Sequence, residues 1–217
     1  MKGKSISVVI RRLRKITKSL NTPVVEQIAK SQEPFRVLIS CLLSLRTRDE
    51  VTYYASERLL NLANMPMTLL KLRPSTIEKA IYPVAFYRIK TKTILHVCQE
   101  LTEKYNHKVP DSLDELLKLK GVGRKTANLT LTLGYGKLGI CVDTHVHRIT
   151  NRWGYLNTKR PEETEMILRA KLPKRYWNEI NGLLVTFGQN ICKPISPYCS
   201  ECCVGEFCSK VGVRRNR

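Results

Sequence analysis

Residues 111–148 read DSLDELLKLKGVGRKTANLTLTLGYGKLGICVDTHVHR, and this stretch decides the fold that the sequence predicts. It begins with residues 114–119, whose pattern is typical of a short helix. Two glycines follow at positions 121 and 123, and a second helix is expected to open near Arg124. Glycine permits backbone conformations closed to other residues and lets a ligand come close to the main chain. The pair therefore predicts a tight hairpin between the two helices.

The expected hairpin has the chemistry of a phosphate site. The first amide N–H groups of a helix have no partner within it, and the helix dipole adds positive potential there. A DNA phosphate could bind at such a place without any base being read. The alternative is an ordinary helical hairpin whose glycines only form the turn. The residues that would surround the phosphate are Lys120, Gly121, Gly123 and Arg124.

The charge of the chain points to a polyanion as partner. Its 217 residues carry 38 Lys and Arg against 18 Asp and Glu, a formal net charge of +20. Such an excess favours DNA or RNA, although a lysine-rich surface that only promotes solubility is the alternative. Hydrophobic residues make up 42% of the chain, which is ordinary for a soluble globular protein. No apolar run approaches the roughly 18 residues of a membrane span, so we expect no membrane contact.

The cysteines are unevenly placed. Three of the eight lie alone in apolar stretches and are expected to be small buried hydrophobes, and the other five lie within residues 192–208. In a reducing compartment, which the absence of a secretory signal favours, a dense group of thiols indicates a metal site rather than disulfides. The spacing suits four thiolate ligands and leaves Cys203 spare, but it does not separate zinc from an iron–sulfur cluster. The expected ligands are Cys192, Cys199, Cys202 and Cys208.

The remainder of the chain predicts an all-α fold. Helical periodicity recurs almost throughout, without strand-like alternation or an internal repeat. Residues 35–49 are apolar almost all round, as in a central buried helix. Residues 87–105 place Ile89, Thr93 or Ile94, Val97 and Leu101 at helical intervals. Helices are also expected to begin near Thr22, Pro34, Asp49, Pro66, Pro74, Pro161 and Tyr176, with caps at Ser112 or Asp111, at Thr47 or Asp49, and in a Ser75–Glu78 capping box.

The N-terminus is basic and amphipathic. Residues 1–18 contain seven basic residues and no acidic one, a pattern shared by transit peptides. An amphipathic helix that packs on the body of the protein explains the same pattern, and we favour it. The apolar face of this helix would consist of Ile6, Ile10, Leu13, Ile16 and Leu20.

Two residues near the hairpin could carry chemistry. Lys125 is expected at a helix N-terminus beside Arg124, where the charged form of an amine is disfavoured and the neutral, nucleophilic form is favoured. Judged alone, a further phosphate-binding cation is the simpler interpretation. Asp143 stands in a basic neighbourhood eighteen residues later. It could be a helix cap, an ion-pair partner or a catalytic carboxylate, and capping is the simplest of these.

Three motifs together resemble the endonuclease III family, DNA glycosylases of the helix-hairpin-helix superfamily. They are LKGVGRKTAN, then VDTHVHR, then the four spaced cysteines, in that order, and the similarity extends from the apolar segment at 35–49 to Cys208. The resemblance implies two all-α lobes: a six-helix lobe over 23–136 that includes the hairpin, and a discontinuous lobe of 1–22 and 137–217. It also favours a [4Fe-4S] cluster on the four cysteines over zinc.

The family mechanism implies roles for the residues that match its motifs. The substrate would be double-stranded DNA with oxidised pyrimidines, of the thymine glycol type, or with abasic sites. A damaged base would be turned out of the stack. Lys125 would attack C1′, and the resulting Schiff base would permit strand cleavage by β-elimination. Asp143 would stabilise developing positive charge and assist proton transfer. His145, in the VDTHVHR motif, would contact DNA.

The chain departs from the family at the position of Arg46, where bacterial relatives commonly carry glutamine. We expect Arg46 to enter the space left by the extruded base, and this exchange leaves opposite-base preference open. Phe86 aligns loosely with a leucine wedge, so it is expected to intercalate, although a buried core position explains a phenylalanine nearly as well.

Two other functions fit parts of the pattern. A monofunctional mismatch glycosylase would remove adenine or thymine, but such relatives generally lack a lysine at the position of Lys125. A non-catalytic iron–sulfur protein that binds DNA would need neither Lys125 nor Asp143. We expect a monomeric, bifunctional enzyme in the cytoplasm at the nucleoid, or in the nucleus or mitochondrion of a eukaryote.

Overall fold

The structure is a computed structural model that describes residues 3–20 and 33–217. The chain divides into two compact units: the N-terminal segment joins Ile140–Arg217 in one, and the other ends at Gly139. The expected second helix near Thr22 lies outside the described residues. No described helix has both the length and the apolarity that crossing a membrane requires.

The expectation of an all-α fold is confirmed, since the described residues contain helices and no strand. In the unit that ends at Gly139 the elements are α3 (Pro34–Ser44), α4 (Asp49–Leu62), α5 (Pro66–Leu70), α6 (Pro74–Ile81), α7 (Tyr87–Lys104), α8 (Leu113–Lys118), α9 (Arg124–Leu129) and the π-helical turn η2 (Thr130–Gly134). The other unit contains α1 (Gly3–Thr17), α10 (Thr144–Arg152), α11 (Pro161–Lys171), the 3-10 turn η3 (Lys174–Tyr176), α12 (Trp177–Asn190) and the 3-10 turn η4 (Gly205–Phe207).

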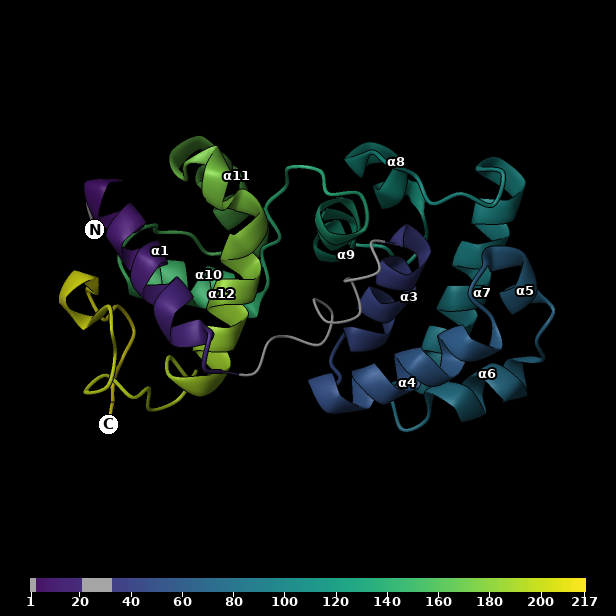
Figure 1. The fold of residues 1–217 in the computed structure, drawn as a ribbon, viewed down its shortest axis with the longest axis horizontal. Helices are drawn as coiled ribbons and strands as arrows, with labels where there is room; N and C mark the ends of the chain where they lie inside the picture. The colour runs from purple at the N-terminus through teal and green to yellow at the C-terminus, as the bar shows by residue number, and fades with distance from the viewer. Residues whose placement is uncertain (1–2, 21–32) are drawn as a thin grey trace. The chain divides into compact units, whose positions relative to one another are not determined.

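Helix α3 forms the centre of the unit that ends at Gly139. Figure 1 shows it between α9 and α7, and it packs against α4 as well. Pro34 occupies its first turn, where a missing N–H costs nothing, and seven consecutive residues from Val37 to Leu43 are buried. The expected central helix is therefore present, but it ends at Ser44, and the chain turns sharply before α4.

The expected apolar face of helix α7 is wrong at one position, because Ile89 does not belong to it. Ile89 is 64% exposed, whereas Lys90 is only 8% exposed and lies on the same face as Ile94, Val97 and Leu101. The periodicity of the sequence fits either residue, because the two positions are only about 100° apart on a helix. Tertiary contacts decide between them, and the lysine is the buried one.

The helix caps show where local pattern succeeds. Ser112 caps α8 by accepting a hydrogen bond from the Glu115 N–H at 3.3 Å, as predicted. The predicted Ser75–Glu78 capping box is wrong, because Pro74 begins the helix and Arg73 becomes its N-cap. The predicted cap of α4 is also wrong, since Arg48 takes the N-cap position and Asp49 the first turn. In both cases the helix begins earlier than a cap at Ser75 or Asp49 would require.

The second unit is built around large buried side chains, among them Trp153, Tyr155 and Phe187. Helix α1 packs beside α12, as Figure 1 shows, so the expectation that an amphipathic helix packs on the body of the protein is confirmed. The predicted apolar face extends too far, because α1 ends at Thr17 and neither Ile16 nor Leu20 belongs to the core. Each of its buried aliphatic side chains contributes about 1.5–3 kcal/mol by leaving water, so α1 is an integral part of this unit. The α1 residues in this core are Ile6, Val9, Ile10 and Leu13.

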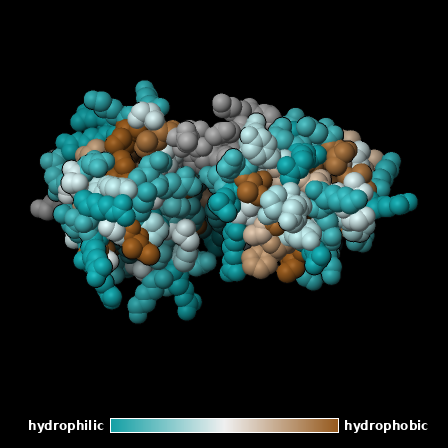
Figure 2. Space-filling view, turned by 90° about the horizontal axis from the view of Figure 1, so that it is seen from below, coloured by the Kyte–Doolittle hydropathy of each residue, from teal (hydrophilic) through white to brown (hydrophobic). Residues whose placement is uncertain are grey.

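The surface of the chain is mainly polar. Figure 2 shows one face, on which hydrophilic residues predominate and hydrophobic ones lie between them in small groups. The exposed large hydrophobic residues of α4 and α5 include Tyr54, Leu62 and Met67.

Candidate DNA-repair site

The predicted hairpin joins α8 to α9. Gly121 has φ +92°, and a Cβ there would lie 2.5 Å from Cγ2 of Thr93 on α7, so only glycine fits this position. Gly123 is different: it caps α9 with φ −92°, and a Cβ would meet nothing within 4 Å. The hairpin therefore requires Gly121 for its fold, whereas Gly123 leaves open space beside an exposed stretch of backbone.

A buried carboxylate fixes the hairpin to α7. Glu100, which is 8% exposed, accepts a hydrogen bond from the backbone N–H of Lys120 at 3.0 Å. Its other oxygen pairs with Lys104 at 2.7 Å, and this bond is the main reason that the pKa of Glu100 is lowered. Lys120 itself stays exposed. Sequence reasoning missed Glu100, whose only signal was a carboxylate in an otherwise apolar helical face.

Lys125 lies in the first turn of α9, directly behind the hairpin, and is half-buried. The helix is held by the residues that follow it, Thr126 to Leu129, all of which are buried. Its charge acts on Cys41 of α3: burial raises the pKa of that thiol to about 12, and the Lys125 ammonium opposes this shift. Lys125 therefore lies next to the core of its unit and is not a fully solvated surface lysine.

Asp143 belongs to the other unit, where it is the N-cap of α10. Its Oδ1 accepts hydrogen bonds from the His145 N–H at 2.9 Å and the Val146 N–H at 2.8 Å. The side chain is 8% exposed. The expectation that Asp143 caps a helix is confirmed, and the two bonds from one oxygen fix the orientation of its carboxylate.

His145 follows in the same helix and is half-buried. Its Nδ1 would lie 2.3 Å from a Cβ on Gly188, so α12 approaches α10 closely enough to require glycine there. Arg148 lies 3.3 Å from the same nitrogen and donates to the Cys192 carbonyl at 2.8 Å. His145 is therefore packed between α10 and α12, and Gly188 is a supporting residue that the sequence did not reveal.

Arg46 and Phe86 share an unusual backbone conformation. Arg46 has φ +55° and Phe86 has φ +58°, the left-handed region that side chains with a Cβ rarely adopt. Both are exposed, Phe86 at 56%, so the alternative of a buried core phenylalanine is wrong. Non-glycine residues are held in this region where the surroundings enforce it, often at functional sites.

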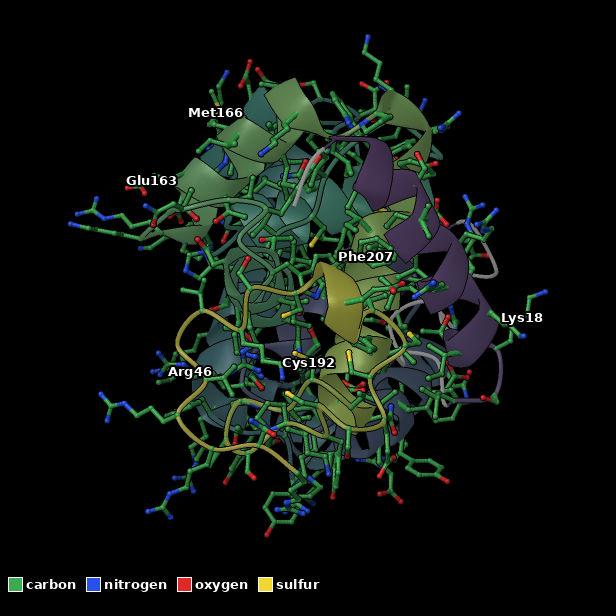
Figure 3. The ribbon with its side chains drawn as sticks, turned by 90° about the vertical axis from the view of Figure 1, so that its left-hand side faces the viewer. Lys18, Arg46, Glu163, Met166, Cys192 and Phe207 are labelled. Carbon is green, nitrogen blue, oxygen red and sulfur yellow. The ribbon has the colours of Figure 1, made fainter. Side chains whose placement is uncertain are left out.

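The four predicted cysteine ligands line one hollow, and Cys203 is not among its lining residues. Figure 3 shows Cys192 and other sulfur atoms among the C-terminal loops. Arg152 donates to the Sγ of Cys192 at 3.3 Å, and the Lys210 N–H donates to the Sγ of Cys208, also at 3.3 Å. In the described part of the chain, no three side chains of His, Cys, Asp or Glu lie close enough to one another to hold a metal ion.

Burial disfavours free thiolates around this hollow. It raises the pKa of Cys202 to about 11, and the neighbouring cysteines add to the shift. Bound cationic metal would compensate for thiolates held together in this way. Four thiols around one hollow are therefore a donor set that fits a metal group with thiolate ligands.

The C-terminal residue packs on the cysteine-rich segment. Arg217 donates its N–H to the Pro197 carbonyl at 2.9 Å and accepts from Ser200 at 3.0 Å. Its guanidinium lies 5.0 Å from the ring of Tyr198. Arg12 of α1 also contacts this segment, because it donates to the Cys203 carbonyl at 3.0 Å and lies 5.2 Å from the ring of Phe207. Figure 3 shows Phe207 beside this helix.

Comparisons with known proteins agree with this site. The family model described as "HhH-GPD superfamily base excision DNA repair protein" matches residues 39–174. "Endonuclease III" of Thermotoga maritima is 50% identical over 179 residues, which cover 82% of this chain and 84% of the relative. "Endonuclease III-like protein 1" of Gallus gallus is 39% identical over 92% of this chain and 75% of its own.

A solved structure, "Structure of a Trapped Endonuclease III-DNA Covalent Intermediate: Estranged-Adenine Complex", superposes with a TM-score of 0.85 at 29% identity, covering 97% of each chain. Sequence and structure therefore lead to one assignment. The chain belongs to the HhH-GPD superfamily of base excision DNA repair proteins, within which it is a DNA glycosylase of the endonuclease III family.

Proposed function

We propose that this protein is a bifunctional DNA N-glycosylase and abasic-site lyase that removes oxidised pyrimidines, of the thymine glycol type, from double-stranded DNA. The observation that carries the proposal is the placement of Lys125, half-buried in the first turn of the helix directly behind the hairpin. The superposed endonuclease III supports it, because that protein was trapped as a covalent intermediate with DNA.

In the proposed reaction the neutral amine of Lys125 attacks C1′ of the extruded nucleotide. The N–C1′ bond forms as the glycosidic bond breaks, and the departing base takes up a proton. Opening of the sugar ring gives a Schiff base between Lys125 and C1′. Loss of a proton from C2′ then breaks the C3′–O bond, which cleaves the strand on the 3′ side of the lesion.

Asp143 is proposed to stabilise the positive charge that develops on the sugar and to assist the proton transfers. Its Oδ1 is already committed to two backbone N–H groups at 2.8 and 2.9 Å, which fix the direction in which the second oxygen points. Capping and catalysis are compatible here, because a carboxylate has two oxygens and can accept more than two hydrogen bonds.

The hairpin is proposed to hold the DNA backbone. Gly123 leaves open space beside its main chain, and Lys120, Gly121 and Arg124 complete the surface on which a phosphate would rest. His145 is also proposed to contact DNA. The net charge of +20 supports a polyanionic partner.

Arg46 and Phe86 are proposed to enter the DNA at the lesion. Both side chains are exposed and are held in strained left-handed backbone conformations. Arg46 would fill the space of the extruded base with a charged hydrogen-bond donor, and the Phe86 ring would insert between bases.

We also propose that Cys192, Cys199, Cys202 and Cys208 hold a [4Fe-4S] cluster, since these four and not Cys203 line the hollow. The cluster, when bound, would cross-link the C-terminal segment. Arg152 would hold the Cys192 ligand in place. It donates to the Sγ of Cys192 and also to the carbonyls of Lys193 at 2.8 Å and Pro194 at 3.1 Å.

Borohydride trapping tests the proposed mechanism. Reduction of the Schiff base should give a stable protein–DNA adduct with a duplex that contains thymine glycol. We expect Lys125→Ala to abolish this adduct and Lys79→Ala, at an exposed lysine of α6, to leave it unchanged. An adduct that persists in Lys125→Ala would overturn the assignment of the nucleophile.

The same assay separates the other candidate functions. A monofunctional mismatch glycosylase would release a base without an adduct, and a non-catalytic iron–sulfur protein would do neither. The 50% identity to an endonuclease III supports the bifunctional enzyme over both.

A further inference from the structure

The buried lysine of α7 has no part in the chemistry described so far. Lys90 is 8% exposed, and burial lowers its pKa to about 8. Its ammonium donates to the Leu43 carbonyl at 2.6 Å, the Leu45 carbonyl at 2.6 Å and the Thr47 hydroxyl at 3.0 Å. All three N–H groups are therefore used, and none of the three acceptors is a carboxylate.

Burying a cation without a countercharge costs free energy. We therefore expect the hydrogen bonds of Lys90 to serve another purpose, such as fixing the position of the backbone that they contact. The three acceptors lie at the end of α3 and in the turn that follows, and this turn carries Arg46. Two of them, the carbonyls of Leu43 and Leu45, are at a helix end where intrahelical partners are lacking. Lys90 thus holds the backbone before the left-handed residue Arg46 and the side chain of Thr47 directly after it.

The second candidate DNA-inserting residue is tied to the same ammonium. Thr47, whose hydroxyl accepts from Lys90, also accepts from the backbone N–H of Ala85 at 3.3 Å. Ala85 precedes Phe86, and the Phe86 carbonyl accepts from the Lys90 backbone N–H at 3.0 Å. Lys90 and Thr47 therefore connect the turn at residues 45–48 with the turn at residues 82–86.

We propose that Lys90 is a positioning residue that fixes Arg46 and Phe86 relative to each other, so that the two side chains enter DNA as one preformed element. This inference rests on the proposed function, and it assigns Lys90 no contact with DNA. Preorganisation of this kind lowers the cost of ordering the two turns when DNA binds. A merely structural lysine would cap α3 and influence the whole unit equally.

A double-mutant cycle separates these two roles. Lys90→Met retains the aliphatic stem and removes the ammonium, and we expect it to lower kcat/KM on thymine glycol DNA about tenfold, the loss of roughly one charge-assisted hydrogen bond. In a background of Arg46→Ala and Phe86→Ala, the same substitution should change kcat/KM less than about twofold, since the residues through which it acts are gone. Lys90→Arg should recover part of the loss, and Lys92→Met, at an exposed lysine of α7, should have no effect.

A tenfold loss that persists in the Arg46→Ala, Phe86→Ala background would overturn the proposal, as would the absence of any loss. Thr47→Val provides a second variant should Lys90→Met fail to fold. It removes the hydroxyl that links the two turns and should show the same non-additivity.

Hydrogen exchange tests the coupling independently of activity. In Lys90→Met the amides of Thr47 and Ala85 should exchange faster together, because both turns lose the same anchor. Faster exchange at Thr47 alone would overturn the coupling. If the wild-type protein neither excises the base nor forms an adduct, the proposed function fails, and the exchange experiment still decides whether Lys90 joins the two turns.

Discussion

The carboxylate of Glu100, buried on α7, accepts a hydrogen bond from the backbone N–H of Lys120 at 3.0 Å and so fixes the entrance to the hairpin. Thr93, two turns earlier on α7, lies against Gly121. One long helix therefore supports the hairpin at two points, and its N-terminal end carries Phe86 and Lys90.

Substitution of Glu100 should loosen the hairpin. Glu100→Gln removes the charge but keeps an acceptor, and we expect a loss of about 1–3 kcal/mol in the free energy of unfolding, with faster exchange of the Lys120 amide. The interaction with Lys104 holds the pKa of Glu100 below its usual 4.5. Its stabilising contribution is therefore full above about pH 4.5 and is lost as the pH falls through the lowered pKa. A Lys120 amide in the wild-type protein that is equally protected above and below that pKa, relative to its intrinsic exchange rate at each pH, would contradict this role.

The two hairpin glycines should respond differently to alanine. Gly121→Ala places a side chain at φ +92° and against Thr93, so we expect destabilisation of about 1–3 kcal/mol by thermal or denaturant unfolding. Thr93→Ser removes the opposing methyl group and should recover only part of this loss, because the backbone strain remains.

Gly123→Ala is the matched variant, since its Cβ meets nothing within 4 Å. We expect a stability change within about 1 kcal/mol. DNA affinity should nevertheless fall if a phosphate approaches the main chain there, as measured by titration at fixed salt concentration. Unchanged affinity would exclude a close phosphate at Gly123.

Two substitutions of Asp143 should separate capping from catalysis. Asn caps helices about as well as Asp, so Asp143→Asn should keep stability within about 0.5 kcal/mol while greatly slowing single-turnover excision. Asp143→Ala should lose about 0.5–2 kcal/mol of stability as well, because the N–H groups of His145 and Val146 lose their acceptor. If Asp143→Asn excised the base at the wild-type rate, Asp143 would have no catalytic role and would only cap α10.

Metal analysis of the purified protein tests the cysteine hollow. We expect about four iron atoms per chain and an absorbance band at about 410 nm. Cys202→Ser should lower the iron content and the stability of the C-terminal segment, whereas Cys203→Ser should change neither, because Cys203 does not line the hollow. One zinc per chain would contradict the proposed cluster.

Several features were accessible from sequence because they depend on neighbours along the chain. Ser112 precedes the α8 helix that it caps, and Gly121 and Gly123 mark the hairpin. Spacing alone selected four cysteines and left out Cys203, and the structure brings the same four to one hollow. Local signals failed where two nearby positions met the same pattern, as at Ser75, which lies within α6 rather than before it.

The sequence by itself determined the helical class, the hairpin and the set of thiols, because periodicity, turn residues and spacing are local properties. Only the tertiary structure decided that Lys90 is buried instead of Ile89, and that Arg46 and Phe86 are exposed in left-handed conformations. The acceptors of Lys90 lie 43 to 47 residues away along the chain. A hydrogen bond over such a separation depends on how α3 packs against α7, and no local pattern contains that information.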